Sequence, residues 1–301
     1  MGTVDLILKV RTGCPENRTN PMHFAETATT EKLLHSNRYK PHRKGETEMP
    51  LAFIIGTAGS GKSLLTAALS EWLKMSKQDV AVVNLDPGAL KLPYSPDVDV
   101  RNYVDVGNLM EKYGLGPNGA LILAADLIAD EIENLTEDIE AANADLVLVD
   151  TPGQMELFAF RASGPYIVNE LTKEPKALVY MYDAVFSINP LNYVSNMFLS
   201  AAVYNRFFQP QIYLLSKCDL LPEAEVKTIT DWAANPRALE DSIEQKLKGT
   251  KRLFSTNMMR AINQLGIKSL LIPVSAKTNQ GLTNLNTTLE RLLTGGEKYT
   301  F

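Results

Sequence analysis

The stretch LAFIIGTAGSGKS, Leu51–Ser63, decides the fold. An apolar run of strand length leads into GTAGSGKS, which fits the phosphate-binding pattern G-x-x-x-x-G-K-[ST], and the residues that follow have helical spacing. Glycines in such a loop let backbone N–H groups point at phosphates, and the start of the next helix adds a partial positive charge. The stretch therefore predicts a nucleotide site in which Lys62 reaches the β- and γ-phosphates and the Ser63 hydroxyl binds Mg²⁺.

Apolar runs of strand length recur along the chain after this stretch, separated by longer segments with helical spacing, such as Lys62–Met75 and Pro190–Arg206. Near-continuous apolar strands are typical of a sheet covered on both faces, and strand–helix alternation predicts right-handed crossovers. We therefore expect a three-layer α/β fold with a mostly parallel central sheet and helices on both faces. The expected strands are Leu51–Gly56, Asp79–Asp86, Ala144–Asp150, Lys176–Ala184, Gln209–Lys217 and Ser269–Ala276.

Residues 1–48 differ in character from the rest of the chain. They are polar, mixed in charge and without sustained periodicity, which is typical of a flexible tail; a regulatory arm is the alternative. The character changes abruptly at Met49, which could itself be the initiator. From 49 to 301 we expect a single domain, with residues 101–142 as a helical insertion between the second and third core strands.

Composition restricts the classes of partner. The net charge of −5 and pI of about 5.4 argue against a general nucleic-acid binder, which would carry a basic balance or stripe. Cys14 and Cys218 give no disulfide framework, and this favours a reducing compartment. No apolar run approaches the roughly 20 residues that a membrane-spanning helix needs. We expect a cytoplasmic protein that binds neither a membrane nor, directly, a nucleic acid.

The segment VLVDTPGQ places Asp150 at the end of the third core strand. Ligands of open α/β sheets bind at the carboxyl ends of strands, so Asp150 should face the Mg²⁺ side of the nucleotide. Gly153 can approach a γ-phosphate with its N–H, and Gln154 can orient an attacking water.

Asp86 ends the second core strand in the same way, within VNLDPG. It is a candidate for a second carboxylate on the metal side or for a general base. An Asp-Pro-Gly turn with no chemical role explains the same residues, so both interpretations stay open.

Two late strands end in SKCD, Ser216–Asp219, and in SAK, Ser275–Lys277. They resemble the guanine-recognition segments [NT]-K-x-D and S-A-K of GTP-binding proteins. An Asp219 carboxylate can accept from both guanine N1–H and the 2-amino group, which adenine cannot offer. The Lys217 stem would lie against the base, and the N–H of Ala276 could donate to guanine O6. Ser216 departs from the usual Asn or Thr, although its hydroxyl can still reach the phosphate loop.

Within the expected insertion lies YGLGPNGALI, Tyr113–Ile122, where Gly116, Pro117 and Asn118 are good turn formers. Together and in this order, the phosphate loop, D-x-x-G-Q, S-K-x-D, S-A-K and the Gly-Pro-Asn segment resemble the GPN-loop GTPases, a family of dimeric P-loop GTPases, and its archaeal-type members most. The resemblance covers about 49–293. Two further stretches are similar to family signatures: NLDPGALKLPYSPDVDVR, Asn84–Arg101, and YDAVFSINP, Tyr182–Pro190.

The resemblance implies a P-loop NTPase fold and a homodimer, formed through the insertion, that hydrolyses GTP with Mg²⁺ to GDP and phosphate. In that family the Gly-Pro-Asn loop crosses the two-fold interface, so Asn118 would act in trans near the partner's γ-phosphate and attacking water. Asp150 would organise Mg²⁺ through water or act as the base. The residues expected to act in hydrolysis are Asp86, Asn118, Asp150 and Gln154. Those expected to hold GTP and its metal are Gly56, Gly59, Ser60, Gly61, Lys62, Ser63, Leu64, Gly153, Lys217, Asp219, Ser275 and Ala276, with Ser63 and, through water, Asp150 on the Mg²⁺ side.

Other interpretations remain. The Gly-Pro-Asn segment would also serve as a plain turn between helices. A P-loop kinase that transfers phosphate to a nucleoside or an RNA end is an alternative, although it leaves Gln154 and the guanine segments unexplained. A GTP-binding scaffold with negligible turnover would carry the same binding residues. A nucleotide-driven switch or assembly factor is the favoured role, and the sequence names no protein client.

Overall fold

The computed structural model describes residues 49–246, 249–264 and 270–294. A seven-stranded sheet has the order β3-β2-β4-β1-β5-β6-β7, and every pair of neighbouring strands is parallel. The strands are β1 (Leu51–Gly56), β2 (Val80–Asn84), β3 (Val98–Asp99), β4 (Leu146–Asp150), β5 (Lys176–Asp183), β6 (Gln211–Ser216) and β7 (Leu271–Pro273). The predicted α/β fold with its mostly parallel sheet is confirmed.

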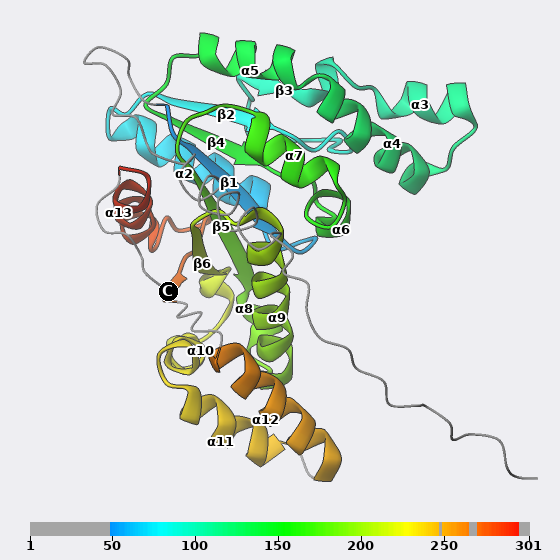
Figure 1. Cartoon of the computed structure of the whole chain (residues 1–301). Helices are drawn as coiled ribbons and strands as arrows, with labels where there is room; N and C mark the ends of the chain where they lie inside the picture. Colours follow the sequence, from blue (N-terminus) through cyan, green and yellow to red (C-terminus); the bar gives the residue numbers. More distant parts are fainter. Residues whose placement is uncertain (1–48, 247–248, 265–269, 295–301) are drawn as a thin grey trace, which may run out of the picture. The chain divides into compact units, whose positions relative to one another are not determined.

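Helices lie between consecutive strands, except between β2 and β3, which a loop connects (Figure 1). Those before β5 are α2 (Lys62–Met75), the short η1 (Val100–Asn102), α3 (Val106–Tyr113), α4 (Pro117–Asp130), α5 (Ile132–Ala141), α6 (Met155–Phe158) and α7 (Ser163–Glu170). Those after β5 are α8 (Ala184–Ser187), α9 (Pro190–Phe207), η2 (Cys218–Leu220), α10 (Glu223–Ala234), α11 (Pro236–Lys246), α12 (Gly249–Gln264) and α13 (Leu282–Leu293). No helix in these described ranges is long and apolar enough to cross a membrane.

The core lies on both faces of the sheet, as the apolar strands require. Side chains alternate along a strand, so Leu51, Phe53 and Ile55 enter one apolar cluster while Ala52 and Ile54 enter the other. The first cluster includes residues of α4, α5, α7 and α9, and the second is formed with α2 and α13. The sheet and the helices on its two faces are the three layers.

Strand β3 was not predicted. It consists of two residues that pair with the end of β2, Val98 beside Val83 and Asp99 beside Asn84. A segment this short, directly after Pro96 and carrying acidic residues, has no room for a detectable apolar pattern.

The residues between β3 and β4 are helical, in η1 and α3 to α5. We predicted a tail over residues 1–48, and these residues lie outside the described ranges. The part of the chain from Met49 onward falls in one unit.

The sheet order places β1 between β4 and β5. The chain passes from β1 to one side of the sheet through α2 and β2, and it later returns to the other side of β1 with β5. Parallel sheets open a crevice at the carboxyl ends of the strands where the order reverses in this way. The phosphate loop, which follows β1, therefore lies at the position where this fold class binds ligands.

Candidate nucleotide site

The phosphate loop joins β1 to α2, and two of its glycines have backbone conformations that other residues rarely adopt. Gly59 and Gly61 have φ of +76° and +96°, where side-chain-bearing residues are strained. A Cβ on Gly56 would lie 2.8 Å from the Ser60 hydroxyl. No side chain caps the N-terminus of α2 at Gly61, so the first N–H groups of the helix stay available for an anion.

Lys62 begins α2 and is almost wholly buried, with 5% of its surface exposed. Its ammonium donates to three backbone carbonyls, those of Gly56 at 3.0 Å, Thr57 at 3.2 Å and Gly153 at 3.5 Å. Burial lowers the pKa of Lys62 below its ordinary value, although the nearby carboxylates of Asp150 and Asp86 oppose the shift. A desolvated cation held by weak carbonyl acceptors is well prepared to exchange them for phosphate oxygens.

Asp150 ends β4 with 1% of its surface exposed. Oδ2 accepts a hydrogen bond from the Tyr94 hydroxyl at 2.8 Å, whereas Oδ1 has no partner among the described residues. Burial raises the pKa of Asp150, against the effects of the Ser63 and Tyr94 hydroxyls and the Lys62 charge. Burial and the charge of Asp150 raise the pKa of Tyr94 as well.

These residues fit a magnesium ion that arrives with its nucleotide. Mg²⁺ is usually held by one or two protein oxygens together with phosphates and waters. The hydroxyl of Ser63 and the unpartnered Oδ1 of Asp150 supply oxygens of that kind. Within the described ranges no group of three or more His, Cys, Asp or Glu side chains is arranged to hold an ion.

Asp86 spans two segments of the site. Its Oδ1 accepts from the N–H of Gly88 at 2.9 Å, which is the turn contact that the sequence allowed. Its Oδ2 accepts from the N–H of Gly153 at 3.0 Å. The amide that we expected to face a γ-phosphate is thus bonded to a carboxylate. Asp86, Gly153 and the exposed Gln154 line one pocket of about 180 Å³, to which Leu121 and Ala125 of α4 also contribute.

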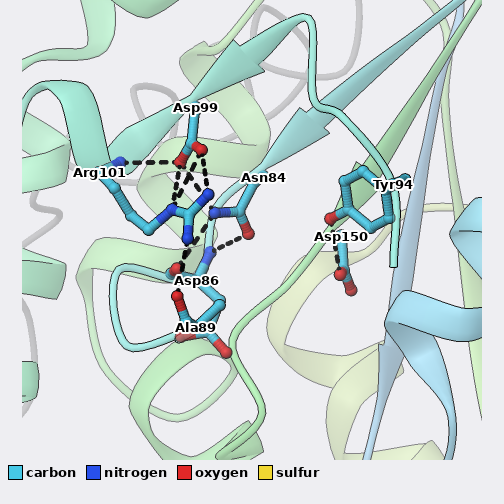
Figure 2. Close-up of polar contacts among 7 residues, drawn as sticks. All are labelled: Asn84, Asp86, Ala89, Tyr94, Asp99, Arg101 and Asp150. Atoms are coloured by element: carbon cyan, nitrogen blue, oxygen red, sulfur yellow. Dashed lines mark hydrogen bonds and ion pairs between the residues drawn. The ribbon is translucent and has the colours of Figure 1, made fainter. Parts of the chain in front are cut away.

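A polar network holds the loop that follows β2 (Figure 2). Arg101 pairs with Asp99 at 2.5 Å and donates to the Ala89 carbonyl at 2.8 Å. Asn84 donates to Asp99 at 2.9 Å and to the Asp86 carbonyl at 3.2 Å, and it accepts from the Asp86 N–H at 3.0 Å. The network ties Asp86 to the ends of β2 and β3.

A second, more apolar pocket of about 220 Å³ lies beside the phosphate loop and is lined by the expected base-binding residues. Its lining includes Ser60, Leu64, Ser216, Lys217, Asp219 and Ala276. Asp219 Oδ1 accepts from the Ser275 hydroxyl at 2.7 Å, which fixes the orientation of the carboxylate. Lys217, with φ of +60°, pairs with Asp183 at 2.6 Å.

Ser216, at the end of β6, is bonded to the phosphate loop and to β5. Its hydroxyl lies 2.9 Å from the carbonyl of Ser60 in the phosphate loop and 3.0 Å from the carbonyl of Tyr182 on β5. The expectation that a serine here still reaches the phosphate loop is therefore confirmed, although it departs from the usual Asn or Thr.

The Gly-Pro-Asn segment is the start of a helix rather than a free loop. Gly116 is the N-cap residue of α4, Pro117 is its first residue and Asn118 follows in the first turn. Proline suits this position because its missing N–H would be unbonded there anyway. Asn118 is exposed, and the described part of the chain shows no hydrogen bond from it to the other candidate residues. Leu121, one turn further along the same helix, lines the pocket of Asp86 and Gly153.

The structure therefore brings the phosphate, metal and base candidates to one edge of the sheet, whereas Asn118 makes no hydrogen bond to them within the described ranges. Sequence reasoning missed Tyr94, Asp183 and the network of Asn84, Asp99 and Arg101. The available signal was that all five residues lie in the two stretches that are similar to family signatures.

Comparison with known proteins agrees with this geometry. A family model described as a conserved hypothetical ATP binding protein matches residues 54–295. The chain is 32% identical over 243 residues to a GPN-loop GTPase of Pyrococcus abyssi, covering 79% of this chain and 94% of that protein. The crystal structure of this Pyrococcus abyssi GTPase in apo form superposes with a TM-score of 0.73 at 32% identity, covering 82% of this chain and 98% of that one.

Two eukaryotic relatives are longer than this chain. GPN-loop GTPase 1 of Saccharomyces cerevisiae is 30% identical over 217 residues, which cover 71% of this chain and 56% of that protein. GPN-loop GTPase 1 of Dictyostelium discoideum is 29% identical over 193 residues, which cover 63% of this chain and 48% of that protein. The chain thus spans about half the length of these two curated relatives.

Proposed function

This chain belongs to the GPN-loop GTPase family, and from that premise we propose that it binds GTP with Mg²⁺, hydrolyses it to GDP and phosphate, and acts as a nucleotide-driven switch. The observation that carries the proposal is the meeting of Lys62, the buried Asp150 and the Gly153 N–H at the carboxyl edge of β1 and β4. These are the groups that phosphoryl transfer needs, since its catalysis consists largely of positioning and charge stabilisation.

The phosphates would lie on Gly59, Ser60, Gly61, Lys62 and Ser63. Lys62 would give up the carbonyls of Gly56, Thr57 and Gly153 for phosphate oxygens, which are stronger acceptors because they are charged. Ser63, and Asp150 through water, would hold Mg²⁺. The ion, when bound, supplies positive charge that neutralises the β- and γ-phosphate oxygens.

The attacking water would lie in the pocket of Asp86, Gly153 and Gln154. Gln154 is exposed at the rim of this pocket and can align the water. Asp86 can accept its proton or serve as a second carboxylate on the metal side. A γ-phosphate would take the Gly153 N–H that Asp86 now holds, so Asp86 has to move when GTP replaces GDP. This exchange is the physical basis that we propose for the switch.

Guanine would occupy the pocket beside Leu64, with its face on the Lys217 stem and its edge on Asp219. Ser275 orients the Asp219 carboxylate, and the N–H of Ala276, which lines the same pocket, would donate to O6. A carboxylate with fixed orientation favours a base that offers two adjacent donors, which supports guanine over adenine.

A homodimer would bring Asn118 of one copy to the phosphates of the other. The support is that Asn118 is exposed at the start of α4, a helix whose next turn already lines the pocket of Asp86 and Gly153. An amide donor placed there would stabilise negative charge that develops during transfer. The switch would then act through opening and closing of the dimer, as an assembly factor for a protein client.

The test is hydrolysis of GTP and of ATP by the full chain, together with its mass in solution, for the wild type, Asn118→Ala and the control Asn134→Ala. Asn134 is an exposed helical asparagine of α5 whose side-chain amide donates to Glu131. We expect a dimeric, GTP-selective wild type, and a loss of turnover of about a hundredfold for Asn118→Ala with dimerisation and GTP affinity retained. Wild-type turnover in Asn118→Ala would refute the role in trans. Binding without turnover in the wild type would favour the scaffold.

A further inference from the structure

Tyr94 is a residue of the site that neither the motifs nor the proposed function uses. It lies in the loop between β2 and β3, within LPYSP, with a proline on either side at Pro93 and Pro96. Proline fixes its own φ and restricts the residue before it, so this stretch has few conformations available. Tyr94 is thus carried on a stiff segment.

Both ends of that loop are tied down. On the far side of Tyr94, Asp97 exchanges bonds with Val82 of β2: its carboxylate accepts from the Val82 N–H at 2.7 Å and its N–H donates to the Val82 carbonyl at 2.7 Å. On the near side, Arg101 holds the Ala89 carbonyl (Figure 2). The path of the loop is therefore set independently of what its tip contacts.

The tip of the loop contacts Oδ2 of Asp150 and not Oδ1. The Tyr94 hydroxyl donates to Oδ2 at 2.8 Å, and Oδ1 has no hydrogen-bond partner in the ranges that the structure describes. Asp150 is 1% exposed, and a buried carboxylate oxygen without a donor is costly. Such an oxygen is expected where a ligand completes the site.

We propose that Tyr94 is a positioning residue that fixes the Asp150 carboxylate through Oδ2, so that Oδ1 is held ready for a water of the Mg²⁺–nucleotide complex. The proposal rests on the proposed function, because it assumes a metal-bound nucleotide at Ser63 and Asp150. Without the Tyr94 hydroxyl the Asp150 carboxylate can rotate or shift. Its orientation is then no longer fixed, and the metal ion should bind more weakly. The loop of Asp86 thereby also contributes to the metal site.

The test compares Tyr94→Phe with the control Tyr103→Phe in the full chain. Tyr103 also donates its hydroxyl to a carboxylate, that of Asp138, but outside the site, so the control removes the same kind of bond. Affinity for GDP is measured in EDTA and across a Mg²⁺ titration, and thermal unfolding is recorded for both variants. The phenyl ring is kept, so the packing of the loop should survive.

We expect Tyr94→Phe to raise the Mg²⁺ concentration for half-maximal tightening of GDP binding by about tenfold, with affinity in EDTA unchanged. Tyr103→Phe should titrate as the wild type does. In an Asp150→Asn background, Tyr94→Phe should add nothing, because its effect acts through that carboxylate. An unchanged or lowered Mg²⁺ requirement, or additive effects in the double variant, would overturn the role of Tyr94. Absence of any Mg²⁺ effect in the wild type would instead overturn the metal site and, with it, the proposed function.

Discussion

The backbone N–H of Gly153 donates to Oδ2 of Asp86 at 3.0 Å, across 67 positions of sequence. The bond joins the segment after β4 to the segment after β2. Both segments lie at the edge where the γ-phosphate is expected, so a carboxylate stands where a phosphate oxygen would otherwise accept from the same amide. A ligand with a third phosphate has to compete with Asp86, whereas a diphosphate does not.

This competition can be measured with Asp86→Ala. Removing the carboxylate frees the Gly153 N–H, so the affinity for a non-hydrolysable GTP analogue should rise relative to that for GDP by about tenfold, the size of one charge-assisted hydrogen bond. Turnover should fall, because we propose that the same residue serves the attacking water. The readout is the ratio of the two dissociation constants. A ratio that is unchanged, or that falls, would show that Asp86 does not hold the amide against the γ-phosphate.

Asp150→Asn should stabilise the nucleotide-free protein. Burial raises the folded-state pKa of Asp150 above the unfolded value of 3.8, so the folded state binds more protons between the two values and the wild type loses stability as pH rises through that window. Asparagine does not ionise, and it removes a buried carboxylate oxygen that has no donor among the described residues, which costs about 1–3 kcal/mol.

Urea unfolding of nucleotide-free wild type and Asp150→Asn at pH 4 and pH 8 measures this difference. The advantage of the variant should be larger at pH 8, and the variant should lose the Mg²⁺-dependent part of nucleotide binding. An advantage that shrinks with rising pH would contradict the raised pKa of Asp150.

Asp183→Asn tests how the base pocket is held together. Oδ2 of Asp183 pairs with Lys217 at 2.6 Å, and Oδ1 caps α8 by accepting from the Phe186 N–H at 3.1 Å. Asparagine can keep the cap while losing the ion pair. We expect GDP and GTP to bind about tenfold more weakly, with turnover at saturating GTP unchanged, because Lys217 is no longer fixed under the base. Glu170→Gln, which breaks the exposed Lys173–Glu170 pair, is the control that should bind normally.

Asp219→Asn addresses the identity of the base. In the proposed site the carboxylate would accept two hydrogen bonds from guanine, whereas an asparagine amide has a donor where xanthine offers its carbonyl at C2. GTP affinity should fall by at least about a hundredfold, and xanthosine triphosphate should bind more tightly to the variant than to the wild type. Equal losses for both nucleotides would place the base elsewhere.

Where local sequence sets the geometry, the site could be predicted. The phosphate loop is one continuous segment between a strand and a helix, so Lys62 and Ser63 could be assigned directly. Asp150 followed from the rule that strands of a parallel sheet present their carboxyl ends together. The same apolar runs indicated every strand except β3.

The missed residues depend on contacts between distant segments. Tyr94 reaches Asp150 across 56 positions, because a loop held by Asp97 and Arg101 runs over the end of β4. Asp183 meets Lys217 because β5 and β6 pair in a register that places Asp183 beside Ser216. The local periodicity of the sequence predicts neither the path of this loop nor the register of these two strands. Asp86 carried two interpretations, and the structure shows its turn contact together with a contact to Gly153.

The Ser216 hydroxyl has one proton to share between the carbonyls of Ser60 and Tyr182. An asparagine at this position would have two amide protons, one for each carbonyl. At any instant one of the two carbonyls therefore lacks this donor. The contact between the base-binding segment of Ser216 and the phosphate loop of Ser60 then keeps some conformational entropy in the nucleotide-free protein. A nucleotide that spans both halves removes this entropy on binding. We therefore expect nucleotides to have shorter residence times here than on a Ser216→Asn variant, so that this one position sets how quickly the protein exchanges GDP for GTP.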